Sequence, residues 1–380
     1  MIRKSKLWLG FLLLLLAAGL LTCWAGSRTV PVLGSRLGDY DGELNPGEFY
    51  TVVDEERRVI DRLSREVAPG DEFFAPDGRH YRVERVKGKV AEARLLGRDR
   101  DILAWEAYFE QVAVPAAVLG PDRTVAIYHT HSDESYVPTD GAASIPYRGG
   151  ILKVGARFSR KLEREGVKVN HDVTPHDPHD AYAYVRSRKT ATRLLQSRPL
   201  ALFDVHRDGV PDPDFYRAYI RGSSVGQIRI VVGRQNPKMS ANLDFAKRLM
   251  SYANRVHPGL VKGIYLGRGN YNQDLSPTAL LLECGTHTLT RPEAERGVML
   301  LAEAVPVVLG LQGSRPDLPE GERPLTERSP GVWRAVGWLA LAAVVGVGGF
   351  LLLSTGSWQG AREKLRQFWS RELGLRKKKG

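Results

Sequence analysis

Hydrophobic and polar positions follow two alternating patterns between residues 124 and 311. Short apolar runs such as "TVAIY" (124–128) and "TALLLECG" (278–285) predict buried strands. Between them, "GGILKVGARFSRKLEREG" (149–166) repeats its apolar residues at helical spacing and ends at a glycine suited to a C-terminal cap. Further strands are predicted at 167–170, 200–209 and 226–233, and further helices at 180–196, 239–256 and 291–309. This alternation is typical of an α/β domain with a mostly parallel sheet and helices on both faces.

An apolar stretch of nineteen residues lies near each end of the chain, at 7–25 and at 335–353. Nineteen residues are enough to span a bilayer, and the basic residues that flank both stretches favour the cytoplasm. We therefore expect residues 1–27 to form a membrane anchor, 333–354 a transmembrane helix and 355–380 a basic cytoplasmic tail. The protein would lie in the cell membrane, with both termini cytoplasmic and the domain between them extracytoplasmic. Two alternatives for the first stretch are a cleaved signal peptide and a lipoprotein signal at Cys23.

The distribution of charge agrees with that topology. Of the formal net charge of +12, residues 1–30 carry +4 and residues 332–380 carry +7, so only +1 remains for the domain between them. The excess of positive charge thus indicates contact with anionic lipids and not with nucleic acid. Only two cysteines occur, one of them in the first apolar stretch, which excludes a disulfide framework.

Residues 28–119 differ from the rest of the chain in composition and hydrophobic pattern, which predict a linker followed by a small α+β module. Within it, "EERRVIDRLSREV" (55–67) has helical spacing, and Asp77-Gly78 indicates a hairpin turn. We expect the α/β domain to occupy residues 120–311, and a linker rich in proline, glycine and charge to follow at 312–332.

Titratable residues gather where three of the predicted strands end: "IYHTHSDE", "FDVHRDG" and "LLLECG". In an open parallel sheet, binding sites form beyond the carboxyl ends of the strands. A catalytic zinc ion (Zn²⁺) commonly takes two histidines and a carboxylate and leaves one position for water. His131 and Glu134 have the three-residue step that lets one loop supply two ligands, and His206 supplies a third. Glu283 then remains as the carboxylate that moves protons during amide hydrolysis.

Other titratable residues have competing interpretations. His129 is the alternative to His131 as a ligand, although it lacks the three-residue step to Glu134. The histidine-rich tract "HDVTPHDPHD" (171–180) has no ordered spacing and contains prolines, so we expect a solvated loop. Cys284 is expected to be a small core residue.

The segments "IYHTHSDESY", "FDVHRDG", "VVGRQNP", "NQDLSPTALLLECG" and "RPEAERGVMLLAEAV" together resemble the stage II sporulation protein P family over about residues 120–310. The resemblance implies a fold like that of zinc amidases and carboxypeptidases, with His131, Glu134 and His206 as zinc ligands and Glu283 as the catalytic carboxylate. Residues of the matching motifs would hold the substrate, foremost Arg207, Arg234 and Asn272. The chain departs from the family pattern in its second hydrophobic segment and in "ECGTHTLT".

For function, the resemblance implies an N-acetylmuramoyl-L-alanine amidase that cleaves peptidoglycan between N-acetylmuramic acid and L-alanine during engulfment in sporulation. It also implies two partners, a lytic transglycosylase like stage II sporulation protein D and a membrane anchor protein. Two alternatives remain open. One is a zinc carboxypeptidase or endopeptidase that acts on cell-wall peptides, and the other is a scaffold that binds the wall without cleaving it.

Overall fold

The computed structural model of the 380-residue chain describes residues 42–111, 124–180 and 182–311, with short pieces at 354–357, 359–360 and 362–363. The described residues between 42 and 311 belong to one compact unit. Over the described residues, no helix is both long and apolar enough to cross a membrane. The apolar stretches at 7–25 and 335–353, from which two membrane segments are predicted, lie outside the described residues.

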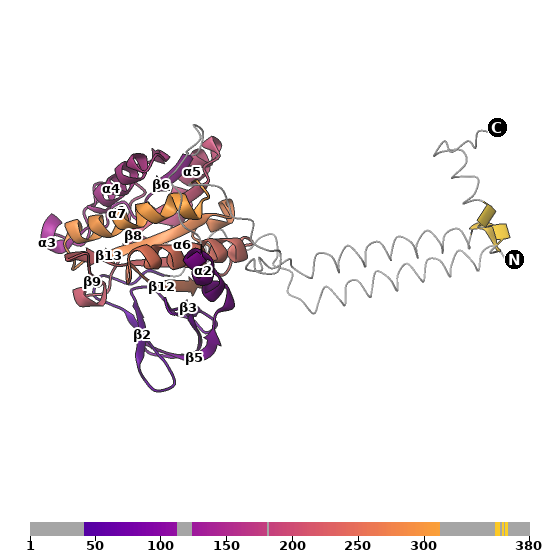
Figure 1. Cartoon of the computed structure of the whole chain (residues 1–380), viewed down its shortest axis with the longest axis horizontal. Coiled ribbons are helices and arrows are strands. Elements are labelled where there is room, and N and C mark those ends of the chain that lie inside the picture. The colour runs from indigo at the N-terminus through magenta and orange to yellow at the C-terminus, as the bar shows by residue number, and fades with distance from the viewer. Residues whose placement is uncertain are drawn as a thin grey trace. The chain divides into compact units, whose positions relative to one another are not determined.

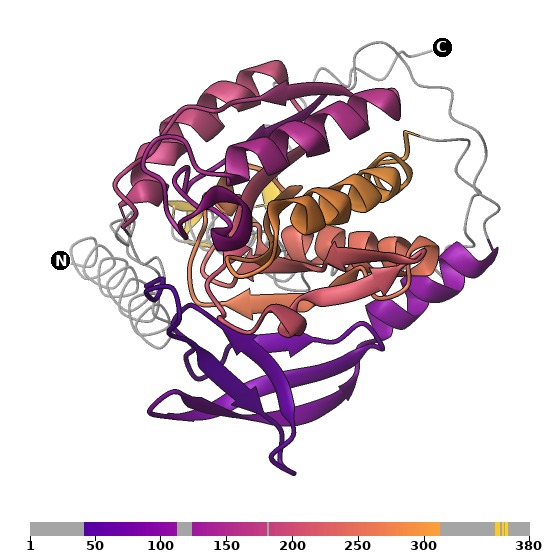
Figure 2. The ribbon, with the colours of Figure 1, turned by 90° about the vertical axis from the view of Figure 1, so that its left-hand side faces the viewer.

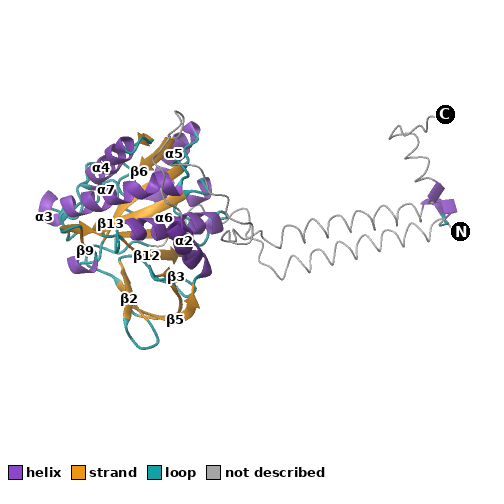
Figure 3. Ribbon diagram, viewed as in Figure 1, coloured by secondary structure: helices purple, strands orange, loops and turns teal. Residues whose placement is uncertain are grey.

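One sheet of eleven strands runs through the compact unit (Figures 1 and 3), in the order β2-β1-β5-β4-β3-β12-β11-β13-β8-β6-β7. The strands of residues 42–111 are β1 (Tyr50–Val53), β2 (Val59–Leu63), β3 (Glu72–Phe74), β4 (Arg79–Lys87) and β5 (Val90–Arg98). Those that follow are β6 (Thr124–Tyr128), β7 (Lys168–His171), β8 (Ala201–Asp208), β11 (Ile228–Gly233), β12 (Val261–Gly267) and β13 (Ala279–Thr286). A separate hairpin joins β9 (Arg217–Ile220) and β10 (Ser223–Gly226).

Strand direction brings the candidate residues to one edge of this sheet. Strands β7, β6, β8 and β13 run parallel to one another, so their carboxyl ends share an edge. Strand β11 runs antiparallel to β13, and β12 is parallel to β11, so these two strands end at the opposite edge. The predicted α/β fold with a mostly parallel sheet is confirmed for the half of the chain from β6 onward, except that β11 and β12 are reversed. Strand β12 was not predicted from the hydrophobic pattern.

The two faces of the sheet are covered differently. Alternate residues of β6 separate them: Val125 and Ile127 belong to the main core, whereas Ala126 and Tyr128 pack with residues of α5 (Ala183–Leu194). Three helices contribute buried residues to the main core: α4 (Ile151–Arg164), α6 (Met239–Val256) and α7 (Arg291–Val308). Helix α2 (Arg100–Gln111) packs on α6, and α3 (Val137–Asp140) is a single turn.

Strands β1–β5 form the amino-terminal module, which continues the sheet through the antiparallel pairing of β3 with β12. Figure 2 shows these strands in indigo and purple as a curved extension of the sheet. The hairpin at Asp77-Gly78 is confirmed, since β3 and β4 pair across it and Gly78 has a φ of +81°. The helix predicted over 55–67 is wrong, because Val59–Leu63 is a strand paired with β1. Its buried side chains alternate along the strand, so tertiary pairing overrides the local helical spacing.

Candidate metal centre

The loop after β6 holds two of the predicted ligands in a tightly bonded turn. Glu134 N donates to His131 O at 3.4 Å, and the incoming segment of α4 is tied to the same loop by Gly149 N to Ser132 O at 2.9 Å. Gly149 fits this close approach because a side chain there would meet backbone, with Glu134 O only 2.3 Å from the point where a β-carbon would lie. The loop is therefore fixed by backbone contacts, and His131 and Glu134 are both buried.

The third predicted ligand, His206, lies opposite Glu283 in the parallel pairing of β8 with β13. His206 Nδ1 is 3.7 Å from Glu134 Oε2, and the rings of His131 and His206 meet edge to face with centroids 5.3 Å apart. The structure thus places His131, Glu134 and His206 side by side at one edge of the sheet.

A residue that the sequence analysis did not identify, Glu43 of the amino-terminal module, is common to two possible ligand groups. One group contains Glu43, Glu134 and His206, and the other contains Glu43, His131 and His179; in each, the ligand atoms lie within 4.8 Å of one another. Glu43 Oε1 is 3.2 Å from His131 Nε2. The three predicted ligands therefore adjoin one another, but Glu43 is what links His131 to the other two.

His179 anchors Glu43 from the histidine-rich tract. Its Nε2 is 2.9 Å from Glu43 Oε2, and its Nδ1 is 3.0 Å from Asp133 Oδ1. Burial alone would lower the pKa of His179, but the hydrogen bonds to Asp133 and Glu43 raise it to about 10. The predicted solvated loop is confirmed for most of 172–180, including the exposed His179, and is wrong at His176, which is buried. His179 also binds Glu43 beside the cluster of predicted site residues, which are His131, Glu134, His206 and Glu283.

Supporting residues orient His206 and Glu134. Asp204 Oδ1 lies 2.9 Å from His206 Nε2 and also accepts from Thr130 N at 2.8 Å. Burial opposes protonation of His206, but Asp204 and Glu134 raise its pKa well above the usual value. A carboxylate on the far nitrogen of a metal-ligating histidine fixes its ring and tautomer. On the other side, Arg207 N donates to Glu134 Oε2 at 2.9 Å.

Glu283 is buried beside Arg65, a second residue of the amino-terminal module. Arg65 Nη2 lies 2.5 Å from Glu283 Oε1, and both side chains are less than 5% exposed. Burial raises the pKa of Glu283 to about 7, although Arg65 acts in the opposite direction. Glu283 Oε2 is buried and has no hydrogen-bond partner among the described residues, so this oxygen is available to a ligand or a water molecule.

The remaining predicted residues do not all join the cluster. Nδ1 of the alternative ligand His129 donates to Val205 O, and its Nε2 shares a hydrogen bond with His171 Nε2, both at 2.9 Å. Arg234 follows β11 at the opposite edge of the sheet and binds Asp71 at 2.8 Å. The Asn272 amide group is buried and donates to Tyr184 O at 2.9 Å. Of the predicted substrate-binding residues, Arg207 is thus the one in direct contact with a predicted ligand.

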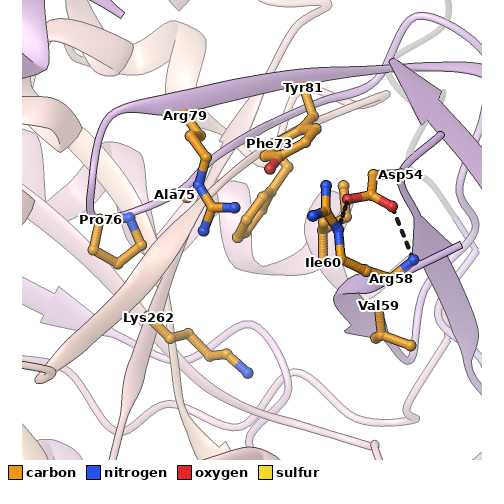
Figure 4. Close-up of a pocket in the computed structure, with 10 residues that line it drawn as sticks. All are labelled: Asp54, Arg58, Val59, Ile60, Phe73, Ala75, Pro76, Arg79, Tyr81 and Lys262. Carbon is orange, nitrogen blue, oxygen red and sulfur yellow. Dashed lines mark hydrogen bonds and ion pairs between the residues drawn. The ribbon is translucent and has the colours of Figure 1, made fainter. Parts of the chain in front are cut away.

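A pocket in the amino-terminal module is lined by residues other than those of the cluster (Figure 4). Its charged groups already have partners, as Arg58 Nε binds Asp54 Oδ2 at 2.7 Å and Lys262 Nζ donates to Phe215 O at 2.7 Å. A third cation, Arg79, binds Asp77 at 2.7 Å. The pocket therefore offers weaker grounds for ligand binding than the cluster.

The cluster suits a metal ion by its chemistry. Nε2 of His131 and Nδ1 of His206 are buried without a hydrogen-bond partner among the described residues, and they lie 3.2 Å from Glu43 Oε1 and 3.7 Å from Glu134 Oε2. Buried polar atoms are normally satisfied, so orphaned imidazole nitrogens beside carboxylates indicate a missing partner. Imidazole and carboxylate are ligands that zinc takes in hydrolases. The residues present thus fit such an ion.

The comparison with protein families identifies the chain. The family model of stage II sporulation protein P matches residues 88–306, which is more than half of the chain. The chain belongs to the stage II sporulation protein P family. The resemblance noted in the sequence is thereby confirmed, and the match includes every predicted ligand, Glu283 and part of the amino-terminal module.

Individual relatives cover only part of this family member. Stage II sporulation protein P of Bacillus subtilis (strain 168) is 29% identical over an alignment of 208 residues, which covers 50% of the chain and 52% of that protein. The chain therefore matches about half the length of this curated relative. Two solved amidases resemble this chain in structure. An N-acetylmuramoyl-L-alanine amidase of Clostridium difficile 630 has 18% identity and a TM-score of 0.31, covering 50% of this chain and 95% of its own. The N-acetylmuramyl-L-alanine amidase of Mycobacterium smegmatis has 14% identity and a TM-score of 0.33, and the match covers 51% of this chain and 99% of that amidase.

Proposed function

We propose that this family member is a zinc-dependent peptidoglycan hydrolase that cleaves the amide bond between N-acetylmuramic acid and the L-alanine of the stem peptide. The observation that carries the proposal is the adjacency of His131, Glu134 and His206, with Glu283 opposite His206, at the carboxyl ends of three parallel strands. Membership in a sporulation family supports a role in cell-wall remodelling.

In the proposed mechanism the chain's own residues orient the reactants and move one proton. Zinc bound by His131, Glu134 and His206 would supply Lewis acidity toward the substrate carbonyl and acidify a water molecule. Glu283 accepts the proton of the attacking water and returns it to the leaving nitrogen of the stem peptide, and so acts first as base and then as acid. Asp204 holds the His206 ring, while Arg207 holds Glu134 through its backbone amide.

The proposal includes a location. The predicted apolar segments at 7–25 and 335–353 would tether the protein to the cell membrane, with the catalytic domain facing the wall. A lytic transglycosylase like stage II sporulation protein D and a membrane anchor protein are proposed as partners, on the basis of family membership.

The deciding experiment is product analysis with a conservative variant. Purified sacculi are digested with wild-type protein and with Glu283→Gln, and the products are identified by mass spectrometry while bound zinc is measured by elemental analysis. We expect wild type to release intact stem peptides, and the variant to keep its zinc but lose at least about a hundredfold in rate, the contribution of a positioned acid-base group.

Other results would refute parts of this proposal. Shortened stems that remain attached to muramic acid would indicate a carboxypeptidase or endopeptidase. Tight binding to sacculi without any released product would indicate a scaffold. Full activity in Glu283→Gln would contradict the role given to that carboxylate.

A further inference from the structure

The amino-terminal module inserts two side chains into the catalytic cluster. Residues 42–44 pair with residues 64–66 as a short antiparallel ribbon, with Glu43 opposite Arg65. Leu44 N donates to Ser64 O at 3.0 Å, and Glu66 N donates to Gly42 O at 3.0 Å. Because the ribbon fixes both residues next to each other, Glu43 and Arg65 reach the cluster as one unit.

Glu43 is a possible fourth ligand beside the three predicted ones. Its Oε1 contacts His131 Nε2 at 3.2 Å, and the same carboxylate forms a possible ligand group with Glu134 and His206. A catalytic zinc ion has three protein ligands and an open fourth position, whereas four protein ligands make a closed, structural type of site. A bound Glu43 would therefore occupy the coordination position that water and substrate require.

Arg65 acts on the other half of the machinery. It pairs with Glu283 Oε1 at 2.5 Å, and the pair is buried. A carboxylate held in a charge-assisted hydrogen bond with an arginine is a weaker proton acceptor than one that faces water. The ribbon thus contacts both a predicted ligand and the predicted base.

We infer that Glu43 closes the metal site and that the described arrangement is a latent form of the enzyme, which becomes active when the 42–44 segment withdraws. The inference rests on the proposed zinc site. The segment is well anchored in this form: His179 Nε2 binds Glu43 Oε2 at 2.9 Å, and Gly47 N donates to Gly209 O at 3.1 Å. Activation would have to break these contacts.

The test measures access to the metal directly. The full-length protein, purified in mild detergent, is loaded with Co²⁺, and its visible absorption spectrum is titrated with acetohydroxamate, a small ligand that needs an open coordination position. In Glu43→Gln we expect acetohydroxamate to bind at least about tenfold more tightly than in wild type, because a competing carboxylate has been removed. Hydrolysis of sacculi should rise in the same variant.

The matched control is Glu48→Gln, which removes an exposed carboxylate five residues further along and should behave as wild type. Glu43→Asp, whose carboxylate is one methylene shorter, provides a second variant if Glu43→Gln does not fold, and it should also admit acetohydroxamate more readily than wild type.

Three outcomes would count against the inference. Equal acetohydroxamate affinity in wild type and Glu43→Gln, with Co²⁺ bound in both, would refute closure by Glu43 and leave the zinc hydrolase intact. A loss of hydrolysis in Glu43→Gln would show that Glu43 serves catalysis. Failure of wild type and variants alike to bind Co²⁺ or Zn²⁺ would refute the proposed function itself.

Discussion

Arg229 of β11 links the amino-terminal module to the catalytic sheet through buried charges, and its removal should be costly. The side chain is fully buried and bonds Asp208 Oδ2 at 2.5 Å through Nη1, while Nη2 bonds Asp61 of β2. Both carboxylates are themselves at most 5% exposed. Replacing Arg229 by methionine keeps much of the volume but leaves two acids without their cation.

The magnitude follows from what remains after the substitution. Breaking a buried ion pair by removing one partner costs about 3–5 kcal/mol. Asp208 keeps Tyr216 OH at 2.7 Å and Ser64 N at 3.1 Å, so most of the penalty falls on Asp61. Burial already raises the pKa of Asp61, and loss of the guanidinium would raise it further. Protonation of Asp61 therefore limits the cost, and we expect Arg229→Met to lower the free energy of unfolding by about 3 kcal/mol at pH 7.

Urea unfolding followed by tryptophan fluorescence measures this difference, with an unchanged m-value as the sign that only stability has changed. The deficit should be smaller at pH 5 than at pH 7. A carboxyl whose folded pKa lies above its unfolded value is penalised increasingly as the pH rises above the unfolded pKa. The matched control is Arg94→Met, since Arg94 pairs with Glu84 on the surface with both side chains 53% exposed. That change should cost no more than about 1 kcal/mol. A loss at Arg229 as small as the control's would refute the reasoning.

Two further predictions concern the loop and helix that support the site. Gly149→Ala should weaken zinc binding and lower the free energy of unfolding by about 1–3 kcal/mol, because the new methyl group would have to displace the backbone of the ligand loop at Glu134. Isothermal titration with Zn²⁺ measures the first effect and urea unfolding the second. Unchanged zinc affinity would contradict the prediction. Glu293→Gln at the start of α7 should cost about 1 kcal/mol at pH 7, since it weakens a capping box with Thr290 and a 2.9 Å bond from Arg217. Burial opposes ionisation of Glu293, but hydrogen bonds from Ser224 and Thr290 lower its pKa to about 2. The stabilisation by its charge is therefore fully present above the unfolded pKa near 4.5 and is lost as the pH falls toward 2. The difference between wild type and Glu293→Gln should therefore shrink below pH 4.5 in urea unfolding, and a constant difference would rule out the carboxylate as its cause.

The sequence predicted the half of the fold from β6 to α7 well, because its signals are local. Apolar runs and helical spacing each depend on a few neighbouring residues, and the polar residues that end β6, β8 and β13 had only to be assigned to one edge. The reversed direction of β11 is not encoded in any such run, since direction depends on which strands pair. The placement of Arg234 at the opposite edge follows from that reversal.

The sequence did not identify Glu43, for a related reason. It lies 88 positions before His131 in a glycine-rich stretch with no periodic pattern, and it approaches the cluster only because residues 42–44 pair with residues 64–66. That pairing depends on the strand at Val59–Leu63, where the local spacing favoured a helix. His179 was missed similarly, because its partners Asp133 and Glu43 are distant in sequence. Asp204 carried a weak signal, two positions before His206 on the same face of a strand.

Alternation along β13 explains why the module and not the helical layer contacts the reactive carboxylate. Leu280, Leu282 and Cys284 pack in the core with α4, α6 and α7, which directs Leu281 and Glu283 to the other face. Leu281 packs in the same cluster as the buried residues of the module, and Arg65 of the module pairs with Glu283 on this face. A buried carboxylate needs a cation or a proton, and in the latent form Arg65 provides the cation. Withdrawal of residues 42–44 would remove Glu43 Oε1 from its position 3.6 Å from Arg65 Nη2, and would thus change the surroundings of the Arg65–Glu283 pair in the same movement that opens the metal site.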